Sequence, residues 1–454
     1  MKNMMAVIGA FLTFAIVGIS ISAFADTDID GFHVQLGGFL ASETVYRDHN
    51  MASDIATPFA KIPFESSMGY APSEFRGTAR QSRFSLLVQR DFDSSTRISG
   101  YYELDFLGAA TTSNSNQSNS YTPRTRNVYL TVDWQDLGLH LLAGQNWSLV
   151  TLNGDGITPR EEIIPATIDA QYAVGFDWAR QWQLRLVKDW NRKYWAGISF
   201  EEPQTVNVGG ELASGTGNTY YLSPGGLMSS NMSINTMPDV VAKFAWESSF
   251  GHYEIYNLAR NFESEYGGAS ISTQINRQNI WTDSVGAGAT IPIVKKILDL
   301  SLSGLIGKGT GRYGTAQLAD ATYDADGQLN PLNASQYLAQ LTWHENKNLD
   351  VYAIYGQENV ISSTGAGYGY GNGIVANNSV CYELGSAACN PEIKSINQIN
   401  IGFWDSLYKK NKMGVLKFGA QYSHTVLNTY ADANGIAPST SEDIVMTSLR
   451  YYPF

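Results

Sequence analysis

Charged residues are scarce in this sequence. Asp, Glu, Lys and Arg make up 16% of its 454 residues, whereas soluble domains usually carry about 25%. Aromatic residues are abundant by contrast, with 26 Tyr, 19 Phe and 10 Trp. Aromatic residues favour strands, so this composition predicts a β-sheet protein in a partly non-aqueous environment.

Positive charge is the scarcer of the two signs. The chain has 30 Lys and Arg against 42 Asp and Glu, which gives a formal net charge of −12. No basic run is long enough to form the charged footprint that a nucleic-acid backbone requires. We therefore expect no nucleic-acid partner.

Residues that build metal sites and catalytic centres are few and scattered. Two cysteines exclude a Cys-rich zinc module and a multi-disulfide scaffold. The six histidines have no metal-ligand spacing; they are His33, His49, His140, His252, His344 and His424. The motifs Gly-x-Ser-x-Gly and His-Glu-x-x-His do not occur. The sequence therefore predicts no enzyme, no catalytic residue, no metal and no cofactor.

A long apolar run occurs at the amino terminus alone. Residues 4–24 carry no charge, follow Lys2 and end in the small-residue pattern around Ala23 and Ala25. This pattern favours a secretory signal peptide, residues 1–25, over an uncleaved membrane anchor. Residues 26–454 would then form the mature protein, in which no other segment approaches 18 apolar residues.

The rest of the chain alternates between polar and apolar residues with the period of two that a two-faced strand shows. We expect sixteen strands, at 31–46, 76–91, 96–107, 124–134, 138–147, 174–188, 193–201, 238–248, 251–261, 278–292, 297–307, 334–344, 348–357, 395–405, 413–425 and 441–454. Seven short turns alternate with eight long loops, at 47–75, 108–123, 148–173, 202–237, 262–277, 308–333, 358–394 and 426–440. This segregation predicts an all-β, membrane-spanning antiparallel barrel with short periplasmic turns and long extracellular loops.

The alternation also predicts which face each residue occupies. In segment 96–107, Ile98 and Tyr102 share one face, whereas Arg97 and Glu103 share the other. A barrel of sixteen strands is too wide for strand side chains to fill. We therefore expect the apolar face to contact lipid and the polar face to line a wet lumen.

Several stretches of the chain form a recognisable set, namely Ala79-Arg-Gln-Ser-Arg-Phe84, Tyr102-Glu-Leu-Asp-Phe106, 123–129, 142–148, 351–356, 400–404 and 448–454. Together they resemble the DcaP-type porins, a family of trimeric outer-membrane channels associated with dicarboxylates and other small anions. The last stretch ends in Phe454 with Tyr452 before it, which is similar to the carboxyl-terminal signal of bacterial outer-membrane barrels. The resemblance implies a homotrimer in the bacterial outer membrane, with lipid and small anionic solutes as partners. Members of the family can carry an amino-terminal coiled coil, whereas here residues 26–30 alone precede the first expected strand.

The third long loop, 148–173, is a candidate pore-constricting loop, because general porins fold a loop into the lumen from this position. It carries Asp155, Arg160, Glu161 and Glu162. Acidic residues here, opposite arginines on the wall, would create a transverse field that orients a passing solute. The alternative is that these are solvated loop charges.

Arginine is locally enriched between residues 76 and 126, where seven arginines stand against four acids. The guanidinium group matches a carboxylate with two parallel donors, so this excess predicts anion preference. From the alternation we expect six pore-lining residues, which are Arg83, Arg97, Glu103, Asp105, Arg185 and Lys243. The alternative is that these charges pair with one another and have no role in transport.

Four other arginines share the parity of apolar neighbours, and their direction stays open at this point. They are Arg76, Arg80, Arg124 and Arg126. A β-bulge could shift the register and turn them inward. Otherwise they lie above the bilayer or in a subunit interface.

The two cysteines, Cys381 and Cys389, lie close together in the long loop 358–394. The expected compartment permits disulfides. We expect one disulfide, which would restrain an external loop.

The sequence thus favours passive diffusion of small hydrophilic solutes, with a preference for anions such as dicarboxylates. One rival is an unselective or cation-preferring general porin, which the overall negative charge would suit. Another rival is a non-conducting barrel, an adhesin or surface-display protein, that presents the loops 202–237 and 358–394.

Overall fold

The computed structural model describes residues 26–109, 121–205, 235–267, 275–325, 328–365, 368–371, 373, 377–410 and 413–454. The expected signal peptide, residues 1–25, lies outside the described residues, as do most of loop 202–237 and parts of loop 358–394. Within the described ranges, no helix is both long enough and apolar enough to cross a membrane.

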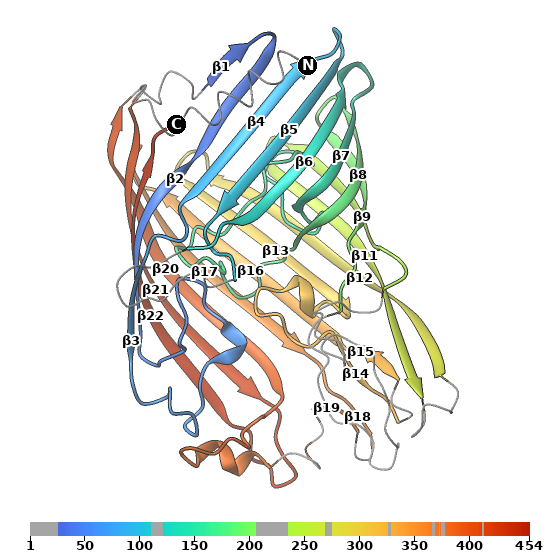
Figure 1. The fold of residues 1–454 in the computed structure, drawn as a ribbon, viewed down its shortest axis with the longest axis vertical. Coiled ribbons are helices and arrows are strands. Elements are labelled where there is room, and N and C mark those ends of the chain that lie inside the picture. Colours follow the sequence, from blue (N-terminus) through green and yellow to red (C-terminus); the bar gives the residue numbers. More distant parts are fainter. Residues whose placement is uncertain are drawn as a thin grey trace.

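Sixteen antiparallel strand positions close into one barrel (Figure 1). The wall consists of β2 (Phe32–Arg47), β3 (Glu74–Thr78) with β4 (Arg83–Asp91) in one position, β5 (Thr96–Asp105), β6 (Arg124–Trp134), β7 (Leu139–Trp147), β8 (Arg180–Trp190), β9 (Tyr194–Glu201), β10 (Asp239–Ser248), β11 (Gly251–Gly267), β12 (Ile275–Val294), β13 (Leu298–Lys308), β16 (Asn333–His344), β17 (Leu349–Val360), β20 (Ile393–Lys410), β21 (Gly414–Thr429) and β22 (Ser439–Tyr452). The barrel closes where β22 pairs with β2, with Leu40 opposite Tyr451 and Arg47 opposite Ile444. The expected closed barrel of sixteen strands is confirmed.

Short turns join the strands at one end of the barrel, and both ends of the described chain lie there (Figure 1). A short strand, β1 (Asp26–Ile29), forms a hairpin with β2 at this end. The long connections lie at the other end and contain β14 (Ala321–Tyr323), β15 (Leu329–Pro331), β18 (Ser363–Gly365), β19 (Tyr368–Tyr370) and the 3-10 turns η2 (Phe59–Lys61), η4 (Gly311–Tyr313) and η5 (Asn378–Tyr382). The 3-10 turn η3 (Gln135–Leu137) lies at the short-turn end, between β6 and β7.

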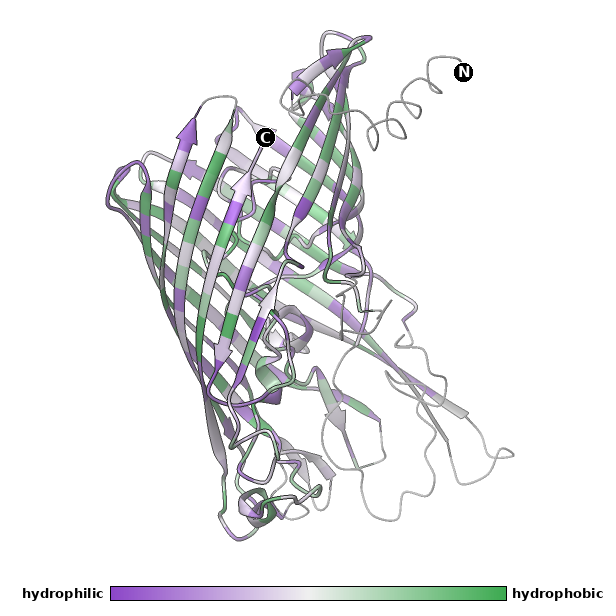
Figure 2. Cartoon of the chain, turned by 60° about the vertical axis from the view of Figure 1, so that its left-hand side comes forward, coloured by the Kyte–Doolittle hydropathy of each residue, from purple (hydrophilic) through white to green (hydrophobic). Residues whose placement is uncertain are grey.

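The outer surface is apolar and the inner surface is polar, as the alternation predicts. Leu130 and Trp182 are about half exposed, at 47% and 52%, whereas Glu103 and Gln183 are buried inside the barrel. Apolar and polar bands alternate along the strands of the wall (Figure 2). This polarity is that of a barrel surrounded by lipid.

Two expected strands differ from the structure. The expected strand 174–188 begins only at Arg180, because residues 174–179 run inside the barrel. The expected strand 76–91 is interrupted between β3 and β4, where two side chains form hydrogen bonds with backbone groups of β2 and of the segment 148–179. Ser82 accepts a hydrogen bond from the Ala41 amide at 3.0 Å, and Gln81 donates to the Ile168 carbonyl at 2.5 Å.

The interior is partly filled by loop residues. The loops 48–73, 148–179 and 309–332 turn inward and pack against apolar patches of the inner wall. In one patch, Leu149 and Ile157 of a loop contact Val187 and Val241 of the wall. At this level the lumen is therefore lined by packed loops, and the strand side chains alone do not define it.

Candidate functional site

The segment between β7 and β8, residues 148–179, crosses the inside of the barrel and is called the inner loop below. It includes the expected loop 148–173 and six further residues. Its backbone amides donate to carboxylate or carboxamide oxygens on seven strands: Leu149 to Glu201, Asn153 to Glu254, Gly156 to Glu247, Ala166 to Gln340, Ile168 to Gln421, Val174 to Gln398 and Gly175 to Glu358, at 2.6–3.2 Å. Paired amides cost little to bury, so these bonds fix the loop across the barrel.

Two glycines allow the inner loop to approach the wall closely. Gly175 has a φ of +84°, and a Cβ atom there would lie 2.0 Å from the Tyr337 carbonyl oxygen. A Cβ atom on Gly356 of β17 would lie 1.7 Å from the Val174 carbonyl oxygen. Because any side chain would clash with backbone at both positions, the loop can lie here only against glycine.

Four arginines gather beside the inner loop and are called the arginine cluster: Arg83 on β4, Arg124 and Arg126 on β6, and Arg180 at the start of β8. Arg126 binds Glu103 at 2.6 Å and Asp105 at 2.9 Å. Arg124 binds the same Asp105 at 2.7 Å. Four guanidinium groups and two carboxylates leave an excess of two positive charges.

A β-bulge turns Arg126 inward. Glu103 pairs with Asn127 and the next residue, Leu104, pairs with Thr125, so Arg126 is the extra residue. Its side chain is 3% exposed and lies on the inner side of the wall. Of the alternatives that parity left open, the bulge is the one that the structure contains at this position.

Two members of the cluster keep free donors. The Nε and Nη1 atoms of Arg180 are buried and have no acceptor among the described residues, as is true of the Arg83 Nε atom. The Arg180 guanidinium lies 5.1 Å from the ring centre of Trp147 and 5.3 Å from that of Trp178. Arg83 approaches Glu103 to 3.8 Å. These three nitrogen atoms are themselves buried, whereas the side chains of Arg83 and Arg180 as a whole are partly exposed.

The positive charge of the cluster affects the pKa of the Tyr172 hydroxyl, which lies on the inner loop. Arg126 donates to it at 3.1 Å. Burial alone would raise the pKa of the Tyr172 hydroxyl, but the charges of Arg126, Arg180 and Arg83 outweigh burial and lower it. The direction of this shift reflects the excess of guanidinium groups around the hydroxyl.

The charged residues expected on the inner loop have different surroundings. Asp155 forms an ion pair at 2.9 Å with Arg192, in the turn after β8. Glu162 receives a long hydrogen bond from Asn146 at 3.5 Å, and burial raises its pKa. Arg160 and Glu161 are exposed.

Arg160 extends the positive surface toward the tyrosines of the wall. Its guanidinium lies 5.4 Å from the ring centre of Tyr101 and donates to the Tyr129 hydroxyl at 3.4 Å. The loop thus contributes a cation near the wall arginines.

Three of the expected pore-lining residues, Arg83, Glu103 and Asp105, belong to the arginine cluster or bind it. Arg97 lies at the short-turn end and binds Asp91 at 2.7 Å, with its side chain 42% exposed. Its position separates it from the cluster.

Arg185 and Lys243 point inward but serve as anchors. Arg185 donates to the Trp147 carbonyl at 2.6 Å and to Gln183 at 2.9 Å. Lys243 is completely buried, binds Glu254 at 2.8 Å and donates to the Thr151 carbonyl at 2.8 Å. Neither charge is exposed to a solute in this arrangement.

Arg76 and Arg80 lie at the interruption between β3 and β4. Arg76 is exposed beside Glu74 at 3.3 Å. Arg80 binds Asp54 at 3.2 Å and donates to the Gly108 carbonyl at 2.9 Å. Arg80 therefore holds loop segments, whereas Arg76 pairs with a residue of its own strand.

The sequence did not single out Arg180, although its position in the cluster is central. Arg180 lies within the expected strand 174–188, where it resembles any polar residue of an alternating segment. Its surroundings come from Trp147 and Trp178, which flank it only because the inner loop returns to the wall beside β7. The one indication in the sequence was Trp178, two residues before Arg180, because an aromatic ring can stack on a guanidinium group.

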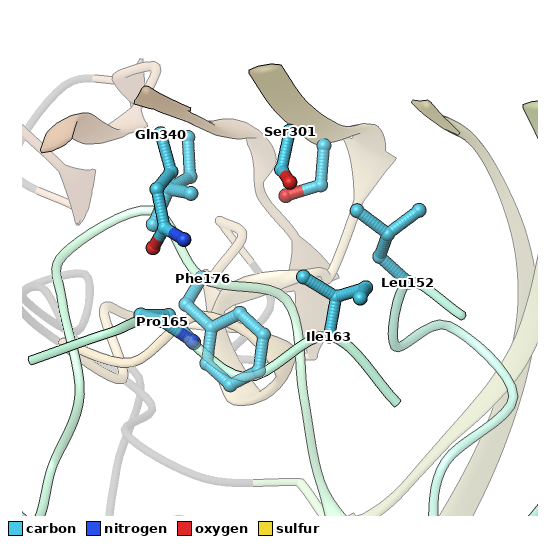
Figure 3. A pocket seen from close by; sticks show the side chains of 8 residues that line it. Leu152, Ile163, Pro165, Phe176, Ser301 and Gln340 are labelled. Atoms are coloured by element: carbon cyan, nitrogen blue, oxygen red, sulfur yellow. The ribbon is translucent and has the colours of Figure 1, made fainter. Parts of the chain in front are cut away.

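A small cavity remains where the inner loop meets β13 and β16 (Figure 3). Its lining consists of Leu152, Ile163, Pro165, Phe176, Ser301, Ser303, Leu338 and Gln340. Its volume is about 10 Å³, which is about the space of one water molecule. The loop therefore packs tightly on this part of the wall.

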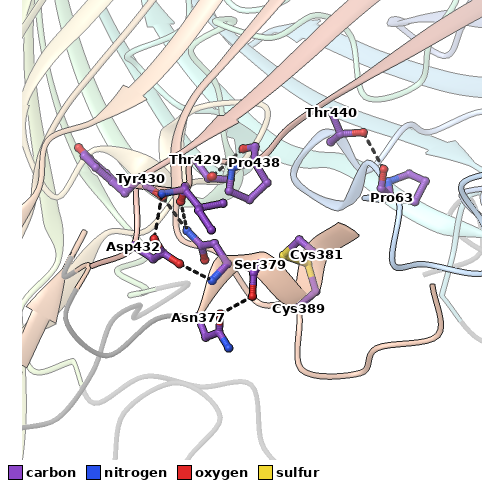
Figure 4. Close-up of a disulfide and its surroundings, with 12 residues drawn as sticks. Pro63, Asn377, Ser379, Cys381, Cys389, Thr429, Tyr430, Asp432, Pro438 and Thr440 are labelled. Atoms are coloured by element: carbon purple, nitrogen blue, oxygen red, sulfur yellow. Dashed lines mark hydrogen bonds between the residues drawn. A yellow bond between two sulfur atoms is a disulfide. The ribbon is translucent and has the colours of Figure 1, made fainter. Parts of the chain in front are cut away.

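Cys381 and Cys389 are joined by a disulfide at the loop end of the barrel (Figure 4). The Cys381 carbonyl accepts from the Ser66 amide at 2.9 Å, so the bridged segment rests on loop 48–73. In that loop the Ile55 carbonyl accepts from the amide of Ala170, in the inner loop, at 3.0 Å. The external disulfide is thus connected to the inner loop through loop 48–73.

No protein-family model matches the chain, and neither does the sequence of any curated protein. Solved structures do match. The outer membrane channel DcaP of Acinetobacter baumannii has a TM-score of 0.63 at 16% identity, with 93% of this chain and 99% of that chain covered. OmpT of Vibrio cholerae and OmpF of Salmonella typhi each have a TM-score of 0.50 at 10% identity, with 94% of this chain and 99% of each of those chains covered. The resemblance to DcaP-type porins that the sequence indicates is confirmed as a likeness of fold.

Proposed function

We propose that this chain is a bacterial outer-membrane channel for passive diffusion of small hydrophilic solutes, with a preference for anions such as dicarboxylates. The apolar outer face and the sixteen-stranded fold support the membrane location. The observation that carries the anion preference is the arginine cluster, in which four guanidinium groups face two carboxylates and Arg180 keeps free donors.

A carboxylate that reaches the cluster meets two kinds of contact. The side chains of Arg83 and Arg180 are partly exposed, and a guanidinium fork suits a carboxylate better than any other side chain. A solute with two carboxylates can contact both arginines at once. The positive potential raises the local anion concentration, while the neighbouring Glu103 and Asp105 keep binding weak enough for release.

The inner loop is the constriction in this proposal. Arg160 stands on its exposed part beside Tyr101 and Tyr129, so a solute that passes the loop encounters positive charge on the loop and on the wall. Of the residues expected to line the pore, Arg83, Glu103 and Asp105 surround the narrow region. Arg97 would act at the short-turn mouth, and Arg185 and Lys243 would hold the constriction in place.

The proposal also includes a cleaved signal peptide, residues 1–25, and a homotrimer embedded in outer-membrane lipid. Both rest on the sequence pattern and on the resemblance to DcaP-type porins. The apolar outer face of the barrel supplies the surface that lipid or a second copy would cover.

The test is a reversal potential measured in planar bilayers under a salt gradient, first with chloride and then with succinate. The wild-type channel should prefer anions. The double variant Arg83→Glu and Arg180→Glu should shift the preference toward cations, because it changes the local charge from +2 to −2. Arg97→Glu makes the same kind of charge change at the mouth and should shift the potential much less.

Other outcomes would replace parts of the proposal. Cation preference in the wild type would keep the channel and remove the anion claim. Silence from a folded barrel would favour the display function, for which the packed loops inside the barrel are the supporting observation.

A further inference from the structure

A second charged cluster, formed by Lys243, Glu247, His252 and Glu254, holds the first part of the inner loop and is called the latch below. Lys243 and Glu247 lie on β10, and the other two lie on β11. The Nε2 atom of His252 lies 3.1 Å from a Glu254 oxygen, and its Nδ1 atom faces a Glu247 oxygen within hydrogen-bond distance. Lys243 binds the other Glu254 oxygen at 2.8 Å.

The same two carboxylates bind the inner loop. Glu247 accepts from the Gly156 amide at 2.6 Å, and Glu254 accepts from the Asn153 amide at 3.2 Å. Lys243 donates to the Thr151 carbonyl at 2.8 Å. The latch therefore fixes residues 151–156 and connects them to one imidazole ring.

The geometry of His252 fits a protonated ring. A neutral imidazole carries one N–H, whereas here each ring nitrogen faces a carboxylate oxygen. When both carboxylates are ionised, both contacts are hydrogen bonds only if both nitrogens donate. With the imidazolium the latch has two positive and two negative charges. Loss of the proton leaves a net charge of −1 among groups of which Lys243, His252 and Glu254 are at most 1% exposed.

We propose that His252 is a proton-dependent latch that holds residues 151–156 of the inner loop when its ring is charged and loosens them when the ring is neutral. Acid would close the latch and alkali would loosen it, because a neutral ring leaves one carboxylate without its donor. Histidine is suited to this function since its charge changes near neutral pH. The effect on ion flow rests on the proposed channel function, whereas the effect on the loop does not.

The charged groups that face the ring come from β10 and β11. Glu247 lies on β10 and Glu254 on β11, and Lys243 reaches the ring through Glu254. On β12 the residue opposite His252 is Thr290, which carries no charge. On the inner loop, Asp155 is held by Arg192, whereas the charges of Glu162 and of Arg185 on β8 act on Lys243.

The chain provides a matched control in His344. Its ring also lies between two carboxylates, Asp350 at 2.6 Å and Asp299 at 3.0 Å. Both partners lie on strands next to β16, and none of the inner-loop hydrogen bonds described above involves them. His344 thus shares the ring arrangement of His252 without its connection to the loop.

The test is hydrogen–deuterium exchange of peptides from residues 149–157 in the full-length, folded barrel at pH 6 and pH 9, corrected for the intrinsic rate at each pH. In the wild type, protection of the Asn153 and Gly156 amides should fall about tenfold from pH 6 to pH 9, the scale of one hydrogen bond to a charged group. His252→Gln should show low protection at both values. His344→Gln should behave like the wild type.

Protection that does not depend on pH in the wild type would overturn the latch. The latch would also be overturned if His344→Gln lost as much protection at Asn153 and Gly156 as His252→Gln. The wild-type measurement needs no substitution, so it stands even if His252→Gln does not fold. Current recordings at the same pH values form a separate arm, with larger fluctuations expected at pH 9. A silent barrel whose exchange follows the expected pattern would remove the channel function and keep the latch.

Discussion

The inner wall has two parts that use polar residues differently. On β9 to β11 and on β16, β17, β20 and β21, carboxylate and carboxamide groups accept hydrogen bonds from packed loops, as Glu358 does from Gly175 of the inner loop and from Ala316 of loop 309–332, both at 2.9 Å. On β4, β6 and β8, donors exceed acceptors, and Arg180 keeps nitrogen atoms without an acceptor in the described part of the chain. The comparison teaches that an inward polar residue can either anchor a loop or keep hydrogen-bonding capacity that no described group uses.

The largest effect on stability should come from Gly356→Val on the anchoring side. The new Cβ atom would lie 1.7 Å from the Val174 carbonyl oxygen, so the inner loop must move away from β17. We expect a loss of about 3 kcal/mol or more and a larger single-channel conductance. The unfolding temperature, read from the shift in gel mobility on heating in detergent, measures the first effect. Unchanged values of both would mean that the loop does not contact the wall here.

A smaller loss is expected from Glu358→Ala, which removes one acceptor shared by two amides. Gly175 and Ala316 would be left without this partner in a buried place, at a cost of about 2 kcal/mol. Glu358→Gln keeps an acceptor oxygen and is the matched control. Equal unfolding temperatures for the two variants would contradict the view that this side chain anchors the loops.

Asp177 should make a smaller, pH-dependent contribution. Burial, followed by the nearby charge of Glu358, raises the pKa of this inner-loop carboxyl well above its usual value. The folded state therefore binds the proton more tightly than the unfolded state, so stability is highest in acid and falls as the pH rises toward the folded-state pKa. Asp177→Asn should raise the unfolding temperature at pH 8 by about 1–3 °C and leave it unchanged at pH 4. A difference of the same size at both values would exclude titration of Asp177 as the cause.

The smallest effect on stability should come from Arg180→Ala on the arginine side. Removal of a buried guanidinium without a carboxylate partner costs little, because lost contact with Trp147 and Trp178 is offset by less repulsion from Arg126. We expect a change in unfolding temperature of less than about 1 °C, together with reduced anion preference in the reversal potential. A marked loss of stability with unaltered selectivity would make Arg180 a structural residue and remove the contrast between the two sides.

Much of the fold could be predicted from sequence, because strand alternation is a local property. Segment 124–134 is predicted to the residue, and the inward direction of Glu103 and Lys243 follows from parity alone. The expected strand 174–188 was extended too far, since the apolar residues of the inner loop resemble a strand. A residue packed inside the barrel and a residue exposed to lipid are equally apolar in the sequence.

The site was less predictable, because its chemistry depends on contacts between distant segments. Lys243 and Arg185 point inward as expected, but their partners Thr151 and Trp147 lie far away in the sequence. Arg126 turns inward through a one-residue bulge that the sequence alone does not locate. Whether an inward charge is satisfied or free follows from such partners and is not encoded in its parity.

The path of the inner loop has a consequence for the assembly of the barrel. The loop precedes β8, yet it bonds to Gln398 and Gln421, more than 200 residues later in the chain. These two hydrogen bonds can therefore form only when β20 and β21 are part of the sheet. In the chain, these strands directly precede β22, whose pairing with β2 closes the barrel. The packing of the loop inside the barrel is therefore completed late in biogenesis, after β20 and β21 have joined the sheet.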